Sequence, residues 1–438
     1  MSESPSALHR IVIVGGGAGG LELATRLGRT LGKRQRAHIT LVDKNMTHIW
    51  KPLLHEVAAG SLNASEDELS YVAQAKWNHF HFQLGGMCGL NREQRQVTLA
   101  ALEDESGAAL IPERVVGYDT LVLAVGSNTN DFGTPGAVEH CLFLDSRAQA
   151  ERLHKLLLDQ YMKAQARTEG LPAEPINIAI IGAGATGVEL AAELQHAARL
   201  LQVYGLDHLR PEDLRIHLIE AGSRVLPVLP ERIAATVSVL LRELGVTLHT
   251  RSQVKEVLAD GLLLASGETL PASIKVWAAG IRAPQFLAGL GLETNRIHQL
   301  LVNRTLQTTL DPHIFAFGDC AACPLGESGG FVPPRAQAAH QQASLLTKNL
   351  ARLLADKPLL DYRYRDHGSL ISLASFSAVG NLMGRLTGSL MLEGTLARLF
   401  YISLYRMHQM TLYGVLRTLL RMLGDRIGRS TEPRLKLH

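Results

Sequence analysis

The chain has few cysteines, with four in 438 residues. Their spacing shows no disulfide framework, which favours a reducing compartment. No grouping of cysteine and histidine has the spacing of a metal site, so the sequence predicts no bound metal ion. The four cysteines are Cys88, Cys141, Cys320 and Cys323.

An excess of charge of one sign is also missing. The formal net charge of +3 is too small to argue for a nucleic-acid partner. The N-terminal segment has no basic region followed by an apolar one, so the sequence predicts no secretory signal and a cytoplasmic start. A hydrophobic content of 46% over this length is typical of a globular chain with two or three domains and large cores.

The segment from Gly394 onward has no apolar run long enough to span a bilayer. Its longest charge-free run, Met407–Leu416, is far short of the ~20 residues that a spanning helix needs. Apolar residues recur there near helical spacing, and no acidic residue occurs between Glu393 and Asp425. This pattern favours amphipathic helices in the membrane surface, the alternative being helices packed on the protein's core or on a second subunit. The apolar positions are Leu396, Leu399, Phe400, Leu404, Met407, Leu412, Leu416, Leu419, Leu420 and Leu423, and the arginines are Arg398, Arg406, Arg417 and Arg421.

The same supersecondary unit occurs twice. Each copy has a short apolar strand, a G-x-G-x-x-G loop and an amphipathic helix, and an acidic residue ends the next strand. This combination is the fingerprint of a dinucleotide-binding fold. The glycines are Gly15, Gly17 and Gly20 in IVIVGGGAGGLELATRLG, and Gly182, Gly184 and Gly187 in INIAIIGAGATGVELAAELQ; the acidic residues are Asp43 and Glu220.

Two fingerprints predict two dinucleotides in one chain. The glycines let the backbone approach a pyrophosphate at a helix N-terminus, and the carboxylate accepts from the ribose hydroxyls. The natural pair is a tightly held flavin and an exchangeable nicotinamide. Glu220 predicts NADH rather than NADPH, although Arg224 nearby could reach a 2′-phosphate if it is not simply solvated.

Three further strands end in glycine, at Gly126, Gly280 and Gly318, and Asp319 follows the last. Over nearly the whole chain this order of motifs resembles the two-dinucleotide-binding-domain flavoproteins. The resemblance implies FAD at the first fingerprint, NADH at the second, and a hydrogen bond from Asp319 to the ribityl-phosphate end of the flavin. From the residues alone, Asp319 could instead be a helix N-cap.

The cysteines exclude the disulfide reductases of that superfamily. Neither the stretch after Asp43 nor the predicted nicotinamide domain carries a redox pair. Cys320 and Cys323 follow Asp319 directly, on the predicted phosphate side of the flavin. We expect them to be small buried thiols rather than a redox pair.

The segment FVPPRAQAAHQQ predicts a helix that begins at Pro334 or the next residue, with Gln337, His340 and Gln341 on one face. A short polar face of this kind is often merely solvated. This segment and the blocks IWKPLLHEVAAG, VWAAGIRAP, FAFGDCAACP and SFSAVGNLMG resemble the type II NADH dehydrogenases, which are single-subunit NADH:quinone oxidoreductases. The resemblance implies that the three side chains bind the quinone and the isoalloxazine edge.

The resemblance assigns roles to two further residues. Glu189 lies two positions after Gly187, where a carboxylate is favoured by the helix dipole without any catalytic role. The resemblance implies that Glu189 lies near the nicotinamide–flavin stack, where it positions NADH or relays a proton. It also implies that Lys51 is among the cofactor-binding residues.

The sequence therefore predicts an α/β protein with two Rossmann-like domains, the second inserted in the first. The FAD-binding domain takes residues 1–145 and 271–356, the NADH-binding domain 146–270, and a membrane-binding region 357–438. In that region, SLISLASFSAVGNLMG predicts strand–turn–strand with the turn at Gly380 and Asn381.

The predicted function is a peripheral membrane flavoenzyme on the cytoplasmic face of the inner (plasma) membrane, possibly a homodimer. It transfers a hydride from NADH to FAD and then two electrons to a membrane quinone, without pumping protons. The alternatives are another quinone reductase of the superfamily, such as a sulfide oxidiser, and a membrane-bound NADH sensor without turnover.

Overall fold

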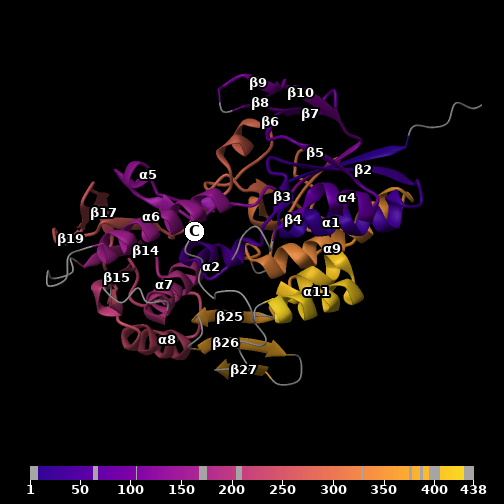
Figure 1. Ribbon diagram of the computed structural model, residues 1–438. Coiled ribbons are helices and arrows are strands. Elements are labelled where there is room, and N and C mark those ends of the chain that lie inside the picture. The colour runs from indigo at the N-terminus through magenta and orange to yellow at the C-terminus, as the bar shows by residue number, and fades with distance from the viewer. Residues whose placement is uncertain are drawn as a thin grey trace, which may run out of the picture. The chain divides into compact units, whose positions relative to one another are not determined.

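Two five-stranded parallel sheets organise the chain, one in each of two units (Figure 1). The computed structural model describes residues 8–62, 68–104, 106–166, 175–203, 210–326, 329–373, 377–384, 388–393 and 405–428. The first unit comprises Met1–Ile49, Glu68–Asn128 and Ile281–Asp366, and the second comprises Trp50–Asp67, Thr129–Gly280 and His367–His438. The parallel sheets confirm the predicted α/β class.

The sheet of the first unit has the strand order β23-β11-β1-β2-β5, with every pair parallel. Its central strands are runs of valine, isoleucine and leucine that are buried on both faces, as expected for a parallel sheet covered by helices. The strands are β1 (His9–Val14), β2 (Ala37–Asp43), β5 (His81–Leu84), β11 (Thr120–Leu123) and β23 (Ile314–Ala316).

Helices and smaller strands complete the first unit, where α1 packs against α9. The helices are α1 (Ala18–Leu27), continued by the π-helix η1 (Gly28–Gly32), α4 (Tyr71–Asn78), α9 (Ala336–Leu353), η4 (Gln285–Gly289) and η5 (Gly318–Cys320). The smaller sheets pair β3 (Thr47–His48) with β4 (Leu69–Ser70), β8 (Leu102–Glu103) with β9 (Ala109–Ile111), β22 (Leu300–Leu301) with β24 (Ala321–Ala322), and β7 (Gln96–Leu99) with β6 (Met87–Asn91) and β10 (Arg114–Gly117).

The sheet of the second unit repeats the arrangement, with the order β13-β20-β14-β15-β16, again parallel. Its strands are β13 (Leu142–Phe143), β14 (Ile176–Ile181), β15 (Leu214–Ile219), β16 (Val246–His249) and β20 (Ile274–Trp277). Its helices include η2 (Lys51–Leu53), α2 (Leu54–Ala59), α5 (Ala137–His140), α6 (Arg147–Gln165), α7 (Ala185–Val203), η3 (Pro211–Asp213) and α8 (Glu231–Glu243).

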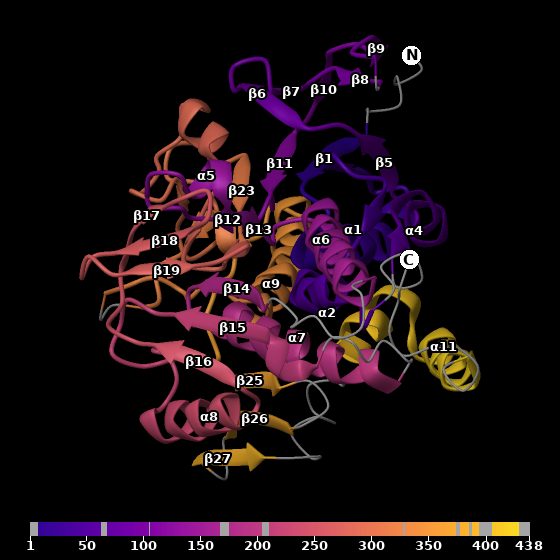
Figure 2. The same cartoon turned by 60° about the vertical axis from the view of Figure 1, so that its left-hand side comes forward.

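Two antiparallel sheets extend the second unit. One contains β17 (Val254–Val257), β18 (Gly261–Leu264) and β19 (Thr269–Pro271). The other contains β25 (Gly368–Leu373), β26 (Ser377–Gly384) and β27 (Gly388–Glu393); α7 contacts β25 and α8 contacts β26 (Figure 2). The predicted turn at Gly380 and Asn381 is wrong, because both residues pair inside β26, between β25 and β27.

The C-terminal region forms helices, as its apolar spacing predicts. Residues 405–413 are helical, and α11 (Val415–Gly428) follows Gly414, whose φ is +83°. The first of these helices packs on the second unit through His408, whose ring lies 4.3 Å from that of the buried Trp50. The predicted positions Leu396, Arg398, Leu399, Phe400 and Leu404 lie outside the described residues.

The two βα turns have nearly the same geometry. Gly15 and Gly182 each have a φ of +104°, a conformation that disfavours any side chain. Gly15 N donates to Val42 O at 2.8 Å, and Gly182 N donates to Ile219 O at 2.7 Å. Each glycine-rich loop is therefore hydrogen-bonded through its first residue to the neighbouring strand.

We expect Gly20→Ala to destabilise the first unit. A Cβ at Gly20 would lie 1.8 Å from Gly15 O, so the loop has to open at a cost of about 1–3 kcal/mol. Gly289→Ala is the control, because a Cβ there meets nothing within 4 Å. Thermal unfolding of both variants measures the difference, and equal melting temperatures would show that the loop is not tightly packed.

Candidate functional site

The first glycine-rich loop is held by three side chains of the first unit. The Asp43 carboxylate accepts from Gly16 N at 2.6 Å and from Asn45 N at 2.8 Å. On the other side of the same residue, Gly16 O accepts from His48 Nδ1 at 2.9 Å and from the Tyr71 hydroxyl at 2.7 Å. The loop is therefore fixed on both sides before any ligand binds.

The histidine and tyrosine at this loop are neutral. Burial lowers the pKa of His48 to about 4, so its ring is uncharged near pH 7 and Nδ1 carries the hydrogen that Gly16 O accepts. Burial, with the charge of Asp43 nearby, raises the pKa of Tyr71 well above its usual value. The side of the loop opposite Asp43 is therefore bound by neutral donors.

The loop leaves room for a phosphate at its middle glycine. A Cβ at Gly17 would meet nothing within 4 Å, although its neighbours in the loop are tightly packed. Gly17 also immediately precedes the first turn of α1, where backbone N–H groups attract an anion. These residues fit the pyrophosphate of a dinucleotide.

The second loop, in the second unit, repeats the pattern. The Glu220 carboxylate accepts from Ala183 N at 3.0 Å and from Gly222 N at 2.8 Å, and a Cβ at Gly184 would meet nothing within 4 Å. A Cβ at Gly187 would lie 2.0 Å from Gly182 O, which matches the close packing in the first loop. Arg224 donates to Pro227 O at 2.9 Å, so its guanidinium turns back onto the following turn.

Two strand ends of the first unit meet around Asp319. Ser127 Oγ donates to the Asp319 carboxylate at 2.9 Å, and Gln299 Nε2 donates to Asp319 O at 2.9 Å. Gly318 N donates to Oε1 of the buried Gln342 at 2.8 Å, which ties this end to α9. The helix N-cap alternative for Asp319 is wrong, because Asp319 lies inside η5, whose N-cap is Phe317. Gly126, with a φ of +73°, follows β11 just before Ser127.

The polar side chains of α9 contact two different parts of the first unit, segment 365–366 and α1. The helix begins at Ala336, slightly later than predicted, with Arg335 at the N-cap. Gln337 Nε2 contacts the Asp366 carboxylate at 3.3 Å, and Gln341 binds both the N–H and the C=O of Arg365, at 3.0 and 2.7 Å.

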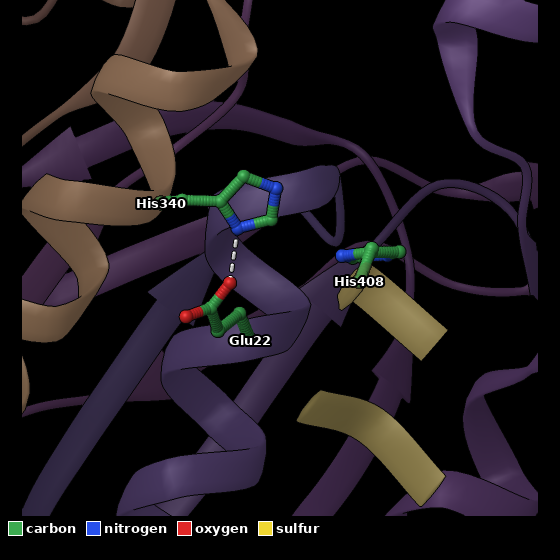
Figure 3. Close-up of side chains that lie close together, drawn as sticks. All are labelled: Glu22, His340 and His408. Carbon is green, nitrogen blue, oxygen red and sulfur yellow. Dashed lines mark hydrogen bonds and ion pairs between the residues drawn. The ribbon is translucent and has the colours of Figure 1, made fainter. Parts of the chain in front are cut away.

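His340 has a different partner from the two glutamines. It turns toward α1, where Nδ1 binds the carboxylate of Glu22 (Figure 3). The three predicted residues therefore share a helix but do not share their contacts.

Glu189 lies in α7 of the second unit and is buried. Its carboxylate is 3.8 Å from Nδ1 of His55, a residue of α2 whose pKa is lowered to about 4 by burial. Lys51 begins η2 in the same unit and is exposed. Gly280 follows β20 with a φ of +66°, and a Cβ there would lie 2.3 Å from the ring of Phe132.

Cys320 and Cys323 are free and buried, as the sequence predicts. Burial raises the pKa of Cys320 to about 11 and that of Cys323 to about 12. Both side chains are therefore thiols near pH 7, which disfavours nucleophilic or redox chemistry because the thiolate is the reactive form.

Sequence reasoning did not single out several residues of these sites. Gln342 directly follows the polar face in the same motif, and its burial was the feature that the sequence could not show. Glu22 had a signal, because it lies two positions after Gly20, just as Glu189 lies two positions after Gly187. The others are His48, Tyr71, Ser127 and His55.

We expect His48 to make stability depend on pH. Its folded pKa of about 4 lies below the unfolded value of 6.5, so the unfolded chain binds more protons between these values. Stability should therefore fall as the pH drops from 6.5 to 4, by about 3 kcal/mol in all from this group. His48→Asn keeps a donor for Gly16 O without titrating and should flatten the slope.

Urea titrations between pH 7.5 and 5 measure this effect, and His140→Asn is the control because His140 is exposed on α5. If the free energy of unfolding depends on pH as steeply in His48→Asn as in the parent chain, the assignment of His48 as a buried neutral group is wrong.

Comparisons with known proteins agree with this geometry. The family model for pyridine nucleotide-disulphide oxidoreductases matches residues 9–343. A type II NADH:quinone oxidoreductase of Haemophilus influenzae is 45% identical, over 98% of this chain and 100% of its own length.

Solved structures share the fold. NDH2 from Plasmodium falciparum in complex with NADH matches with a TM-score of 0.82 at 18% identity, over 98% of this chain and 99% of that one. The sulfide:quinone oxidoreductase of Aquifex aeolicus matches with a TM-score of 0.72 at 18% identity, over 93% of this chain and 92% of that one.

Proposed function

The chain belongs to the type II NADH:quinone oxidoreductases, within the pyridine nucleotide-disulphide oxidoreductases, and we propose that it oxidises NADH and reduces a membrane quinone. The observation that carries the proposal is the pair of glycine-rich loops, each with an open middle glycine and a carboxylate at the next strand end. A single-site dehydrogenase needs only one such loop. Bound FAD would supply the means of accepting a hydride and passing on two electrons.

The first loop fits the FAD. Gly15, Gly17 and Gly20 form the turn, and Asp43 stands where a ribose would lie. Gly126, Gly318 and Asp319 lie at strand ends of the same sheet, so the opposite end of an extended cofactor has partners there. Lys51 and Gly280, the other predicted cofactor residues, keep those assignments as part of the proposal.

The second loop fits NADH, with Gly182, Gly184 and Gly187 at the pyrophosphate and Glu220 at the ribose. A carboxylate here accepts from a 2′-hydroxyl and repels a 2′-phosphate. The guanidinium of Arg224 donates to Pro227 O. In this orientation it weakens the repulsion between Glu220 and a 2′-phosphate less than it would if it pointed toward Glu220. Glu189, buried beside His55, is proposed to position the nicotinamide.

The polar face of α9 is proposed to receive the quinone. Gln337 and His340 would hydrogen-bond the quinone carbonyl oxygens and the isoalloxazine edge. Gln341 is proposed to act mainly through segment 365–366, because both ends of its amide bind Arg365. The N-terminus of α9 also favours negative charge that develops nearby.

The proposed domains follow the sequence prediction, with FAD at 1–145 and 271–356, NADH at 146–270, and membrane binding at 357–438. No helix among the residues that the structure describes is both long and apolar enough to cross a membrane. In α11, however, Leu416, Leu419, Leu420 and Leu423 are each at least half exposed at i, i+3, i+4 and i+7 spacing. This face, with Arg417 and Arg421 beside it, supports an interfacial membrane anchor. The cytoplasmic face of the membrane, like the homodimer, is part of the proposal on the sequence alone. The homodimer remains a prediction.

A flavin and half-reaction assay tests the proposed function. Protein purified in detergent should carry a flavin spectrum that NADH bleaches and a short-chain quinone restores. Gln337→Ala should slow the restoration roughly 10- to 100-fold, because a buried quinone oxygen loses its donor, and should slow the bleaching little.

The outcomes separate the alternatives. Bleaching by NADH without restoration by quinone would favour an NADH sensor. Bleaching by sulfide rather than by NADH, followed by restoration by quinone, would favour a sulfide oxidiser. A protein without flavin would contradict the proposal altogether. If Gln337→Ala slows bleaching by NADH as much as restoration by quinone, α9 serves hydride transfer from NADH rather than quinone binding.

We expect the exposed face of α11 to bind membranes. Leu416 is 72% exposed and Leu420 is 61% exposed, so each can insert into the acyl boundary without disturbing the fold. The double variant Leu416→Gln, Leu420→Gln should bind anionic vesicles at least ~10-fold more weakly, since burial of one leucine is worth ~1.5–3 kcal/mol.

Vesicle co-sedimentation measures this binding. Met162→Gln is the matched control, because Met162 is 49% exposed on α6, outside the proposed anchor. If the double variant and the control pellet alike, α11 is not the anchor. Substitution is preferable to truncation, since His408 of the preceding helix covers Trp50.

A further inference from the structure

Glu22 is a buried carboxylate in α1 that the proposed chemistry has not used. Its side chain is 2% exposed, and it is the one acidic residue of α1. Oε1 accepts from Arg26 Nε at 2.8 Å, and Arg26 Nη2 is 2.7 Å from the same oxygen. Oε2 binds Nδ1 of His340, which reaches across from α9 (Figure 3).

The internal repeat indicates that this position is a functional one. Glu22 follows Gly20 by two residues, and Glu189 follows Gly187 by two residues. Both carboxylates are buried and each faces a histidine, but the distances differ: Glu22 binds His340 directly, whereas Glu189 and His55 are 3.8 Å apart. The first repeat therefore contains the closer carboxylate–imidazole pair.

The two partners of Glu22 explain why it can be buried with its charge. An isolated carboxylate is costly to remove from water, and here each oxygen has a donor. Since a carboxylate only accepts, Nδ1 of His340 must carry a hydrogen. The ring is thus fixed in one orientation, with Nε2 on the edge away from Glu22.

We propose that Glu22 is a positioning residue for quinone reduction, which holds the His340 ring in the orientation from which it passes a proton to the quinone. The inference rests on the proposed function. The quinone becomes a quinol by accepting a hydride, which brings two electrons and one proton, and a second proton from the His340 imidazolium. The imidazole that remains regains its proton from water.

The test compares two electron acceptors in the holoenzyme. Ferricyanide accepts electrons without a proton, whereas quinone needs one from the protein. In Glu22→Gln, reoxidation by a short-chain quinone should slow about 10-fold or more, because a general acid contributes about 10²- to 10⁴-fold. Bleaching by NADH and reoxidation by ferricyanide should stay near the parent rates.

Glu151→Gln is the matched control. Like Glu22, Glu151 pairs with an arginine one helical turn away, Arg147, but the Glu151 side chain is exposed on α6. This variant should leave all three rates unchanged. Parallel slowing of the quinone and ferricyanide reactions in Glu22→Gln, or no slowing of either, would overturn the proposal.

A double-mutant cycle on thermal unfolding gives a readout without turnover. Glu22→Gln and His340→Gln should have non-additive effects on the melting temperature, because each removes the same ion pair. Additive effects would overturn the pairing. If Glu22→Gln folds poorly, His340→Gln alone should slow reoxidation by quinone while leaving reoxidation by ferricyanide near the parent rate. If the parent enzyme does not reduce quinone, the proposed function is wrong. The double-mutant cycle on thermal unfolding would then still test the contact between Glu22 and His340.

Discussion

The hydrogen bond that a strand-end carboxylate accepts from the second residue of a glycine-rich loop is the constraint on which the rest depends. Asp43 accepts it from Gly16 N, and Glu220 accepts it from Ala183 N. Each bond fixes a loop that is rich in glycine and so has few side chains of its own to pack. The open middle glycine, the helix N-terminus behind it and the ribose-binding carboxylate then occupy fixed positions, which is what an extended dinucleotide requires.

The two repeats differ in what surrounds this shared constraint. In the first unit, His48 and Tyr71 clamp Gly16 from the far side, and α9 supplies Gln342 to Gly318. Such extra contacts suit a cofactor that stays bound. Among the residues that the structure describes, fewer side chains hydrogen-bond to the second loop. This suits a nucleotide that must leave after each turnover.

The sequence predicted what depends on local pattern. Both fingerprints, their strands and the α9 helix followed from glycine spacing and apolar runs. Contacts between segments far apart in sequence did not follow, because periodicity does not tell which side chains meet. The attachment of Gln341 to Arg365 and the pair of Glu22 with His340 are of this kind. The turn at Gly380 failed because strand pairing overrode a local turn signal.

The central claim is that the first loop binds FAD and the second binds NADH. Flavin content and NADH affinity in two matched variants test it most directly. A Cβ at Gly17 or at Gly184 meets nothing within 4 Å in the protein, so Gly17→Ala and Gly184→Ala should both fold. The account predicts that Gly17→Ala loses flavin, and that Gly184→Ala keeps flavin but binds NADH more weakly. Flavin loss in Gly184→Ala, or full flavin and unchanged NADH affinity in both variants, would contradict it.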